Sequence, residues 1–121
     1  MRNIIFPRRR QPTPLATEHE FDLSSGGRTR IALTDADKAG RDRLVEWMTT
    51  LELDVRVDRI GNIFGTLLSP PDTGDQAPLM IGSHIDTVAN AGALDGCYGV
   101  LAGLAVARAF REAGRLPERS I

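Results

Sequence analysis

The chain has 121 residues, of which 41% are hydrophobic and 26% charged, and its formal net charge is −1. This size and composition are typical of one soluble globular domain, or of part of one. A net charge so near zero gives no electrostatic basis for binding nucleic acid or an anionic membrane, and no apolar run approaches the length of a bilayer span. The single cysteine excludes an internal disulfide and favours a cytoplasmic location.

The N-terminal 30 residues are predicted to form an extended or poorly ordered lead-in. They lack sustained periodicity and carry three prolines and two glycines. Arginines at positions 8–10 are followed by acidic residues and not by a continuous apolar segment, so we expect neither a signal peptide nor a transit peptide. The basic run is interpreted as a solvated arm.

A helix is predicted over residues 35–53. Thr34 is a favourable N-cap, Asp37 follows it at the spacing of a capping box, and Asp35 suits the positive start of the helix. The apolar residues that share one face at helical spacing are Leu44, Val45, Trp47, Met48 and Leu51.

Three strands are predicted after this helix. Residues 55–59 alternate between apolar and polar positions, and residues 63–68 resume as a second strand after the Gly61–Asn62 turn. The run LMIGSH, residues 79–84, is predicted to be a short buried strand that ends at His84.

A second helix is predicted over residues 97–114. Its first half is apolar nearly all round, so we expect it to be buried, and Gly114 followed by Pro117 suits its end. The order helix, strand, strand, strand, helix predicts an α/β layered fold with helices packed on a sheet.

The stretch IGSHIDTVANAGALDG places His84, Asp86 and Asp95 beyond the carboxyl end of the predicted third strand, where open α/β sheets carry their sites. Imidazole and carboxylate are good ligands for zinc or a similar divalent ion. Residues 84 and 86 share one side of a strand, so Asp86 can accept the other ring N–H of His84. The alternative interpretation is a hydrogen-bonded core histidine beside aspartates that form turns or cap a helix.

Two other chemistries fit the stretch less well. Ser83 and His84 are strand neighbours that point to opposite faces, which makes them a poor nucleophile and base pair. Cys97 near a helix start could be a nucleophile, but such a residue is more often a small buried hydrophobe. The loop NAGALDGCYG departs from the phosphate-loop pattern and has no lysine.

Three segments in this order, TRIALTDADKAGRDRLVEWM, VRVDRIGNIFGTL and IGSHIDTVANAGALDGCYGVLAGLAV, resemble the amidase, hydantoinase/carbamoylase family. The family is a branch of the zinc aminoacylase and carboxypeptidase superfamily, and the resemblance covers about residues 28–114. It implies that residues 31–121 are the N-terminal portion of a three-layer α/β/α catalytic domain with a mixed sheet, truncated after about three strands. Family members include N-carbamoyl-L-amino-acid amidohydrolases, allantoate amidohydrolases and beta-ureidopropionases.

The resemblance also implies roles for individual residues. His84 matches a ligand of one metal, Asp95 matches the carboxylate that bridges two metals, and Asp86 matches the catalytic-site acid that supports the histidine. Gly96 and Gly99 match small positions where the following helix packs closely. The implied cofactor is a pair of divalent ions, Zn²⁺ in the first place and otherwise Mn²⁺, Co²⁺ or Ni²⁺. The implied substrates are small N-carbamoyl or ureido compounds, and full-length members are expected to be homodimers.

This sequence departs from the family pattern at its C-terminal side. The Glu-Glu pair that supplies the general base, and the two later histidines, have no counterpart; His19 lies in the lead-in and is not assigned to the site. Catalytic zinc sites use about three protein ligands, so we expect weak metal binding and no turnover by the isolated chain. The alternatives are a non-enzymatic remnant and one half of a split enzyme, either of which would associate through its open sheet edge.

Overall fold

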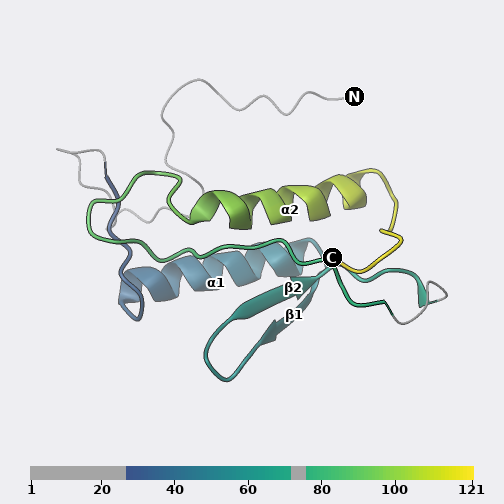
Figure 1. Ribbon diagram of the computed structural model, residues 1–121, viewed down its shortest axis with the longest axis horizontal. Coiled ribbons are helices and arrows are strands. Elements are labelled where there is room, and N and C mark those ends of the chain that lie inside the picture. The colour runs from purple at the N-terminus through teal and green to yellow at the C-terminus, as the bar shows by residue number, and fades with distance from the viewer. Residues whose placement is uncertain (1–26, 72–75) are drawn as a thin grey trace.

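A computed structural model describes residues 27–71 and 76–121 of the chain (Figure 1). The predicted lead-in thus lies outside the described residues as far as position 26, and so does His19. Two helices and one β-hairpin make up the regular structure of the described residues. Their bounds are α1 (Asp35–Thr50), β1 (Asp54–Val57), β2 (Ile63–Thr66) and α2 (Cys97–Glu112). None of the described helices is long and apolar enough to cross a membrane.

The predicted start of α1 is confirmed. Thr34 is its N-cap, and the Thr34 side chain accepts a hydrogen bond of 3.3 Å from the Asp37 N–H. The Asp37 carboxylate reaches back and accepts the Leu33 N–H at 3.0 Å, in the manner of a capping box. Leu44 and Met48 are buried, as the apolar face predicts. The helix ends three residues before the predicted position, because the chain turns at Glu52, whose φ is +54°.

The two predicted strands after α1 form an antiparallel hairpin. Val55 lies opposite Gly65, and Val57 lies opposite Ile63. The connecting turn is held by Asp58, whose side chain accepts hydrogen bonds from the backbone N–H groups of Ile60 and Asn62 at 3.0 and 2.8 Å. The hairpin packs against α1. Leu67 follows β2 and is buried at 1% exposure, so this edge of the hairpin is fixed in the core.

The Asp58 turn gives a pH-dependent prediction. Desolvation raises the pKa of the Asp58 carboxyl, but hydrogen bonds from Asn62, Ile60 and Gly61 outweigh it and hold the pKa below its ordinary value. A carboxyl with a lowered folded-state pKa stabilises the fold above its unfolded-state pKa, near 4, and this contribution is lost as the pH falls through the folded-state value. We expect Asp58→Asn to lower the melting temperature at about pH 7 and to differ little from the unaltered chain near about pH 2. A thermal unfolding series measures this, and a pH-independent difference would contradict it.

The third predicted strand is not formed, and the sheet of the described residues has two antiparallel strands in place of the predicted mixed sheet of about three. Residues 79–84 are extended but carry no strand assignment. A strand is defined by a ladder of backbone hydrogen bonds to a neighbour, and among the described residues this segment makes one such bond, from the Leu79 N–H to the Ser120 carbonyl at 2.8 Å. The predicted burial of this segment is also wrong, because no described neighbour covers its side chains: Met80 is 77% exposed and Ile81 42%.

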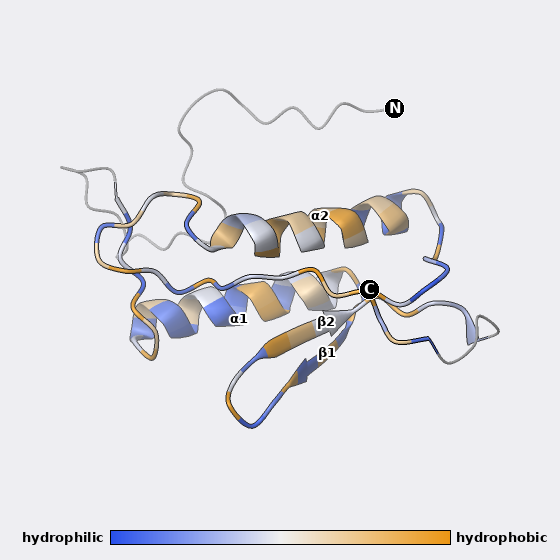
Figure 2. Cartoon of the chain, in the orientation of Figure 1, coloured by the Kyte–Doolittle hydropathy of each residue, from blue (hydrophilic) through white to orange (hydrophobic). Residues whose placement is uncertain are grey.

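The expected burial of the first half of α2 is wrong except at Cys97. Cys97 and Ala107 are the buried residues of this helix, whereas Tyr98 is 69% exposed. Figure 2 shows apolar residues along most of α2, only part of which faces α1 and the hairpin. One face therefore joins the core, and the other is left uncovered. The core cluster consists of Leu44, Met48, Ile85 and Cys97, with partly buried neighbours that include Val100 and Leu104.

Two contacts fix the ends of the helices to each other. The Arg111 side chain of α2 donates hydrogen bonds to the carbonyls of Leu51 and Glu52, at the end of α1, with lengths of 2.9 and 2.6 Å. At the other end of the fold, residues 84–91 pass from the core toward the start of α2 (Figure 1). This segment carries the candidate site.

Candidate functional site

His84 and Asp86 lie together, as the sequence predicts. The Nδ1 of His84 is 3.2 Å from an oxygen of the Asp86 carboxylate and 2.9 Å from the Asp86 backbone carbonyl. Both side chains are about half exposed, at 53% and 46%. A core histidine would be buried, so the alternative interpretation of His84 as a satisfied core residue is excluded.

The two contacts determine which ring nitrogen carries the proton. A carbonyl oxygen and an ionised carboxylate can only accept hydrogen bonds, so Nδ1 must donate. In the neutral imidazole the other nitrogen, Nε2, then keeps its lone pair. No described residue hydrogen-bonds to Nε2. A ligand nitrogen that faces outward, with its partner nitrogen held by a carboxylate, is the arrangement that metal-binding histidines use.

The loop that carries Asp95 lies next to the His84 ring. Gly96 adopts φ +64° and lies directly against the His84 ring, because a Cβ built on Gly96 would be 2.5 Å from both Nδ1 and the His84 carbonyl oxygen. The loop that carries Asp95 therefore approaches the imidazole as closely as a backbone can. Gly99 makes a similar approach to Ser83, where a Cβ would be 2.8 Å from the Ser83 Cβ. The close packing predicted at Gly96 and Gly99 is confirmed.

Asp95 is not a helix cap. Gly96 is the N-cap of α2 and makes no side-chain capping bond. The Asp95 side chain is exposed, and within residues 27–71 and 76–121 its carboxylate makes no hydrogen bond or ion pair. An exposed carboxylate without a protein partner is available to a cation from solution.

Neither nucleophile hypothesis is supported. Cys97 is a free thiol at 1% exposure, packed in the core with Leu44 and Met48, as its interpretation as a small buried hydrophobe predicts. Ser83 lies against Gly99 of α2, and among the described residues no hydrogen bond joins its hydroxyl to the His84 ring.

A buried arginine holds the segment between His84 and Asp86, and the sequence analysis missed it. Arg30 is fully buried, and its guanidinium donates to the Ile85 carbonyl at 2.9 Å. Its backbone N–H donates to the Thr87 hydroxyl at 2.7 Å, and its carbonyl accepts the Thr87 N–H at 2.7 Å. The sequence does carry a signal for this burial, because Arg30 is followed by the apolar residues 31–33 in the stretch TRIAL. The end of the predicted lead-in, residues 27–30, is thus packed against the site loop.

The described side chains fit part of a metal site. His84 and Asp95 supply one nitrogen and one carboxylate, a donor set suited to zinc and similar divalent ions. Across the described ranges, no three or more His, Cys, Asp or Glu side chains are grouped so that they could hold a metal ion together. The ion would need further ligands from beyond the described residues.

Comparisons with known proteins identify the family of this chain. A family model described as Peptidase family M28 matches residues 62–121. The crystal structure of a hydantoinase/carbamoylase family amidase from Burkholderia ambifaria superposes with a TM-score of 0.76 at 39% identity, over 84% of this chain. This chain belongs to the hydantoinase/carbamoylase amidase family. Its M28 match places the motif around His84, Asp86 and Asp95 inside the matched region.

Curated relatives agree with this assignment. An N-carbamoyl-L-amino-acid amidohydrolase of Rhizobium meliloti is 40% identical over 90 residues, which are 74% of this chain. An allantoate amidohydrolase of Bacillus subtilis is 35% identical over 101 residues, or 81% of this chain. This hydantoinase/carbamoylase family member spans 21% and 23% of the length of these two relatives, and 25% of the Burkholderia ambifaria chain.

Proposed function

We propose that this chain contributes one part of the active site of a metal-dependent amidohydrolase that cleaves a C–N bond in a linear N-carbamoyl or ureido compound. His84 and Asp95 are the metal ligands in this proposal, and Asp86 holds His84 in its binding tautomer. The remaining ligands and the general base come from polypeptide beyond the described residues.

One observation carries the proposal. The Nδ1 of His84 faces two acceptors on Asp86, at 2.9 and 3.2 Å, so that Nε2 is left to bind a cation. Gly96 lies against the same ring, beside Nδ1 and Cε1, so the loop that carries the exposed Asp95 is next to the imidazole. The relatives named N-carbamoyl-L-amino-acid and allantoate amidohydrolases support the substrate class.

A divalent ion in such a site polarises the scissile carbonyl and provides a nucleophile at neutral pH. The residues of this chain act before any bond is broken. Asp86 fixes the rotation and the protonation of the imidazole, and Arg30 fixes the peptide that joins Asp86 to His84. These contacts orient ligands.

A grafting experiment tests the proposal directly. The segment of the Rhizobium meliloti enzyme that aligns with this chain is replaced by the residues of this chain, and hydrolysis of an N-carbamoyl amino acid is measured with and without a chelator. We expect metal-dependent turnover by the graft. His84→Asn and Asp95→Asn are each expected to lower kcat/KM by about 100-fold or more, because each removes a ligand, and Asp86→Asn by about 10- to 100-fold.

The matched control for the graft is Asp42→Asn. It makes the same chemical change on the exposed face of α1, where Asp42 forms only a surface ion pair with Lys38. We expect its kcat/KM to equal that of the graft. Full activity of the His84→Asn graft, or a folded graft that binds metal without turnover, would contradict the assignment.

The isolated chain gives a separate prediction. With two ligands available, Zn²⁺ affinity is expected to be weak, with a Kd on the order of 0.1–1 mM, set by the small ligand count. A titration followed by the NMR signals of the imidazole measures it, and His84→Asn should abolish the response. N-carbamoyl amino acids should not be turned over. Tight binding or chelator-sensitive turnover by the chain alone would show that its ligand set is complete.

A further inference from the structure

Asp95 and Gly96 form the only Asp-Gly pair in the sequence. In such a pair the backbone nitrogen of the glycine can attack the aspartate carboxyl group, because no Cβ on the glycine hinders the approach. The product is a five-membered succinimide ring, which water opens to an aspartyl or an isoaspartyl linkage. In a folded protein this reaction requires that the carboxylate and the following N–H are not held by other partners.

Both groups meet this requirement at Asp95. Within the described residues its exposed carboxylate makes no hydrogen bond or ion pair, and the Gly96 N–H donates to no acceptor. The peptide between the two residues is bonded through its oxygen, because the Asp95 carbonyl accepts the Cys97 N–H at 2.7 Å. Gly96 is the N-cap of α2, so the helix does not use the Gly96 N–H.

Asp37, in the first turn of α1, shows the opposite situation. Its carboxylate accepts the Leu33 N–H at 3.0 Å. The N–H that follows it, that of Lys38, donates to the Thr34 carbonyl at 2.9 Å. The reaction at Asp37 therefore requires the first turn of the helix to open, and Asp37 is the natural reference for the reactivity of Asp95.

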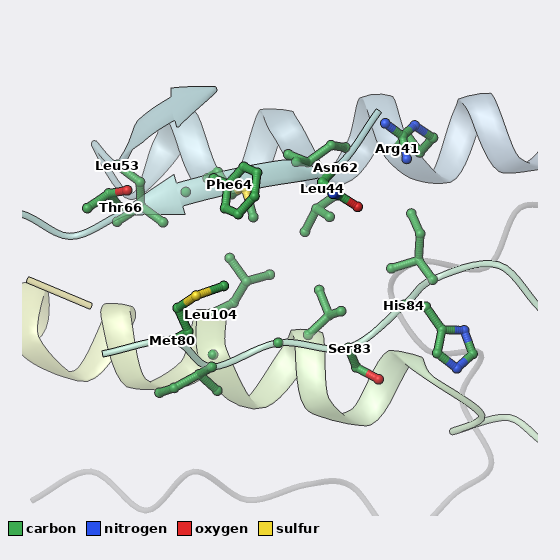
Figure 3. Close-up of a pocket in the computed structure, with 18 of the residues that line it drawn as sticks. Arg41, Leu44, Leu53, Asn62, Phe64, Thr66, Met80, Ser83, His84 and Leu104 are labelled. Atoms are coloured by element: carbon green, nitrogen blue, oxygen red, sulfur yellow. The ribbon is translucent and has the colours of Figure 1, made fainter. Parts of the chain in front are cut away.

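The loop of Asp95 is also accessible to water, one molecule of which is released by the reaction and another consumed. Figure 3 shows the His84 side chain at one end of the groove along residues 80–84, beyond Ser83 and opposite the end that holds Met80. The His84 side chain is 53% exposed, and Gly96 lies against its ring. Water therefore reaches the place where the ring would close and open.

We propose that Asp95 and Gly96 form a site of spontaneous isoaspartate formation, and that a divalent ion bound by Asp95 protects it. The Gly96 nitrogen forms a bond to the Asp95 Cγ, and one carboxylate oxygen leaves as water with the amide proton and a proton from solvent. Water then adds to the α-carbonyl of the ring, whose bond to nitrogen breaks. The added water returns one proton to the nitrogen and one to solvent, and the backbone now runs through Cγ.

The modification removes a ligand from the candidate site. It lengthens the backbone before Gly96 by one methylene and attaches the carboxylate directly to the Cα of residue 95. Gly96 has no free space beside His84, because a Cβ there would be 2.4 Å from Cε1 and 2.5 Å from the His84 carbonyl oxygen. The longer backbone disturbs this contact, so a metal-free site loses Asp95 with time. The protection by metal rests on the proposed function, whereas the reaction itself does not.

The Lys38→Gly variant of the full chain tests the reaction, because it places a second Asp-Gly pair at residues 37–38. It is incubated without metal for several weeks near neutral pH. Isoaspartate is then measured with protein L-isoaspartate methyltransferase and by chromatography of the peptides that contain residues 37 and 95. We expect isoaspartate to form at residue 95 at least about 10-fold faster than at residue 37, where the helix must open first. Equal rates at the two pairs would overturn the proposal.

Incubation of the unaltered chain with Zn²⁺ separates the modification from the proposed function. At a Zn²⁺ concentration of about ten times the Kd, about a tenth of the chain is metal-free, so the rate at residue 95 should fall about 10-fold. His84→Asn removes the other ligand, and its rate should not respond to Zn²⁺. If Zn²⁺ leaves the rate of the unaltered chain unchanged, Asp95 is not a metal ligand and its protection is refuted, although the modification site stands.

Discussion

Arg30→Ala is expected to lower the melting temperature of the chain by more than about 10 °C, and at 37 °C to leave much of it unfolded. Arg30 is fully buried, and its side chain passes over Gly40 of α1, where a Cβ would be 3.1 Å from the Arg30 Cδ. Its guanidinium reaches the Ile85 carbonyl at 2.9 Å and the Cys97 sulfur at 3.8 Å. One side chain thus contacts α1, the site loop and the start of α2.

Two costs add in this variant. Truncating a large buried side chain leaves a cavity and costs about 3–5 kcal/mol in comparable core sites. The buried Ile85 carbonyl also loses its donor, and an unsatisfied buried acceptor costs about 1–3 kcal/mol more. Natural domains are stable by only about 5–15 kcal/mol in total. The described part of the chain buries few side chains and leaves one face of α2 uncovered, so the loss should approach its whole free energy of unfolding.

Two further variants test how much of this loss comes from the buried guanidinium. One changes Arg30 conservatively, and the other is a control at a surface arginine. Arg30→Lys keeps the charge and most of the apolar stem but cannot reproduce the planar fork, so an intermediate loss is expected. Arg43→Ala removes an arginine from the exposed face of α1, where it pairs with Glu46, and should change the melting temperature by no more than about 2 °C. Thermal unfolding followed by circular dichroism compares the three. An Arg30→Ala chain as stable as Arg43→Ala would show that Arg30 does not hold the fold together.

The elements that the sequence predicted well are those whose signals are local. Thr34 and Asp37 define the start of α1 through contacts within one turn, and Asp58 closes the hairpin within five residues. Residues 79–84 show the limit of such signals. Their apolar pattern indicates a buried strand, but strand formation needs a neighbour, and a neighbour on the side of β2 is present only at Ser120 and Ile121.

The candidate site was predictable to a similar degree. The spacing of His84 and Asp86 is local, so their pairing follows from the sequence, and the structure brings them together. Arg30 was missed because its partners, Ile85 and Thr87, lie 55 and 57 residues away, and a buried arginine cannot be distinguished from a solvated one by composition. The burial of α2 was overestimated for the same reason. The apolar sequence of α2 indicates that other elements pack on the helix. It does not indicate whether those elements are among the described residues.

Gly96→Ala is expected to disrupt the candidate site far more than Gly114→Ala, although both glycines have a positive φ. Their φ values are +64° and +62°. At Gly114 nothing lies within 4 Å of an added Cβ, so alanine there costs only the strain of the left-handed region, about 1–2 kcal/mol. At Gly96, where ψ is −43°, alanine is strained as well, and the methyl group would also collide with the His84 ring and the His84 carbonyl oxygen.

The collision at Gly96 cannot be relieved by rotating the imidazole alone. The Cβ would be 2.5 Å from the His84 backbone oxygen as well as from Nδ1, so either the Asp95 loop or the segment at His84 must move. We expect Gly96→Ala to weaken the Zn²⁺ response of the His84 NMR signals by about 10-fold or more, whereas Gly114→Ala should leave it unchanged while lowering the melting temperature. Gly114→Ala thus serves as the control for alanine at a positive φ with no close neighbour. If both variants bind Zn²⁺ as the unaltered chain does, the loop of Asp95 and the ring of His84 do not act on the same ion.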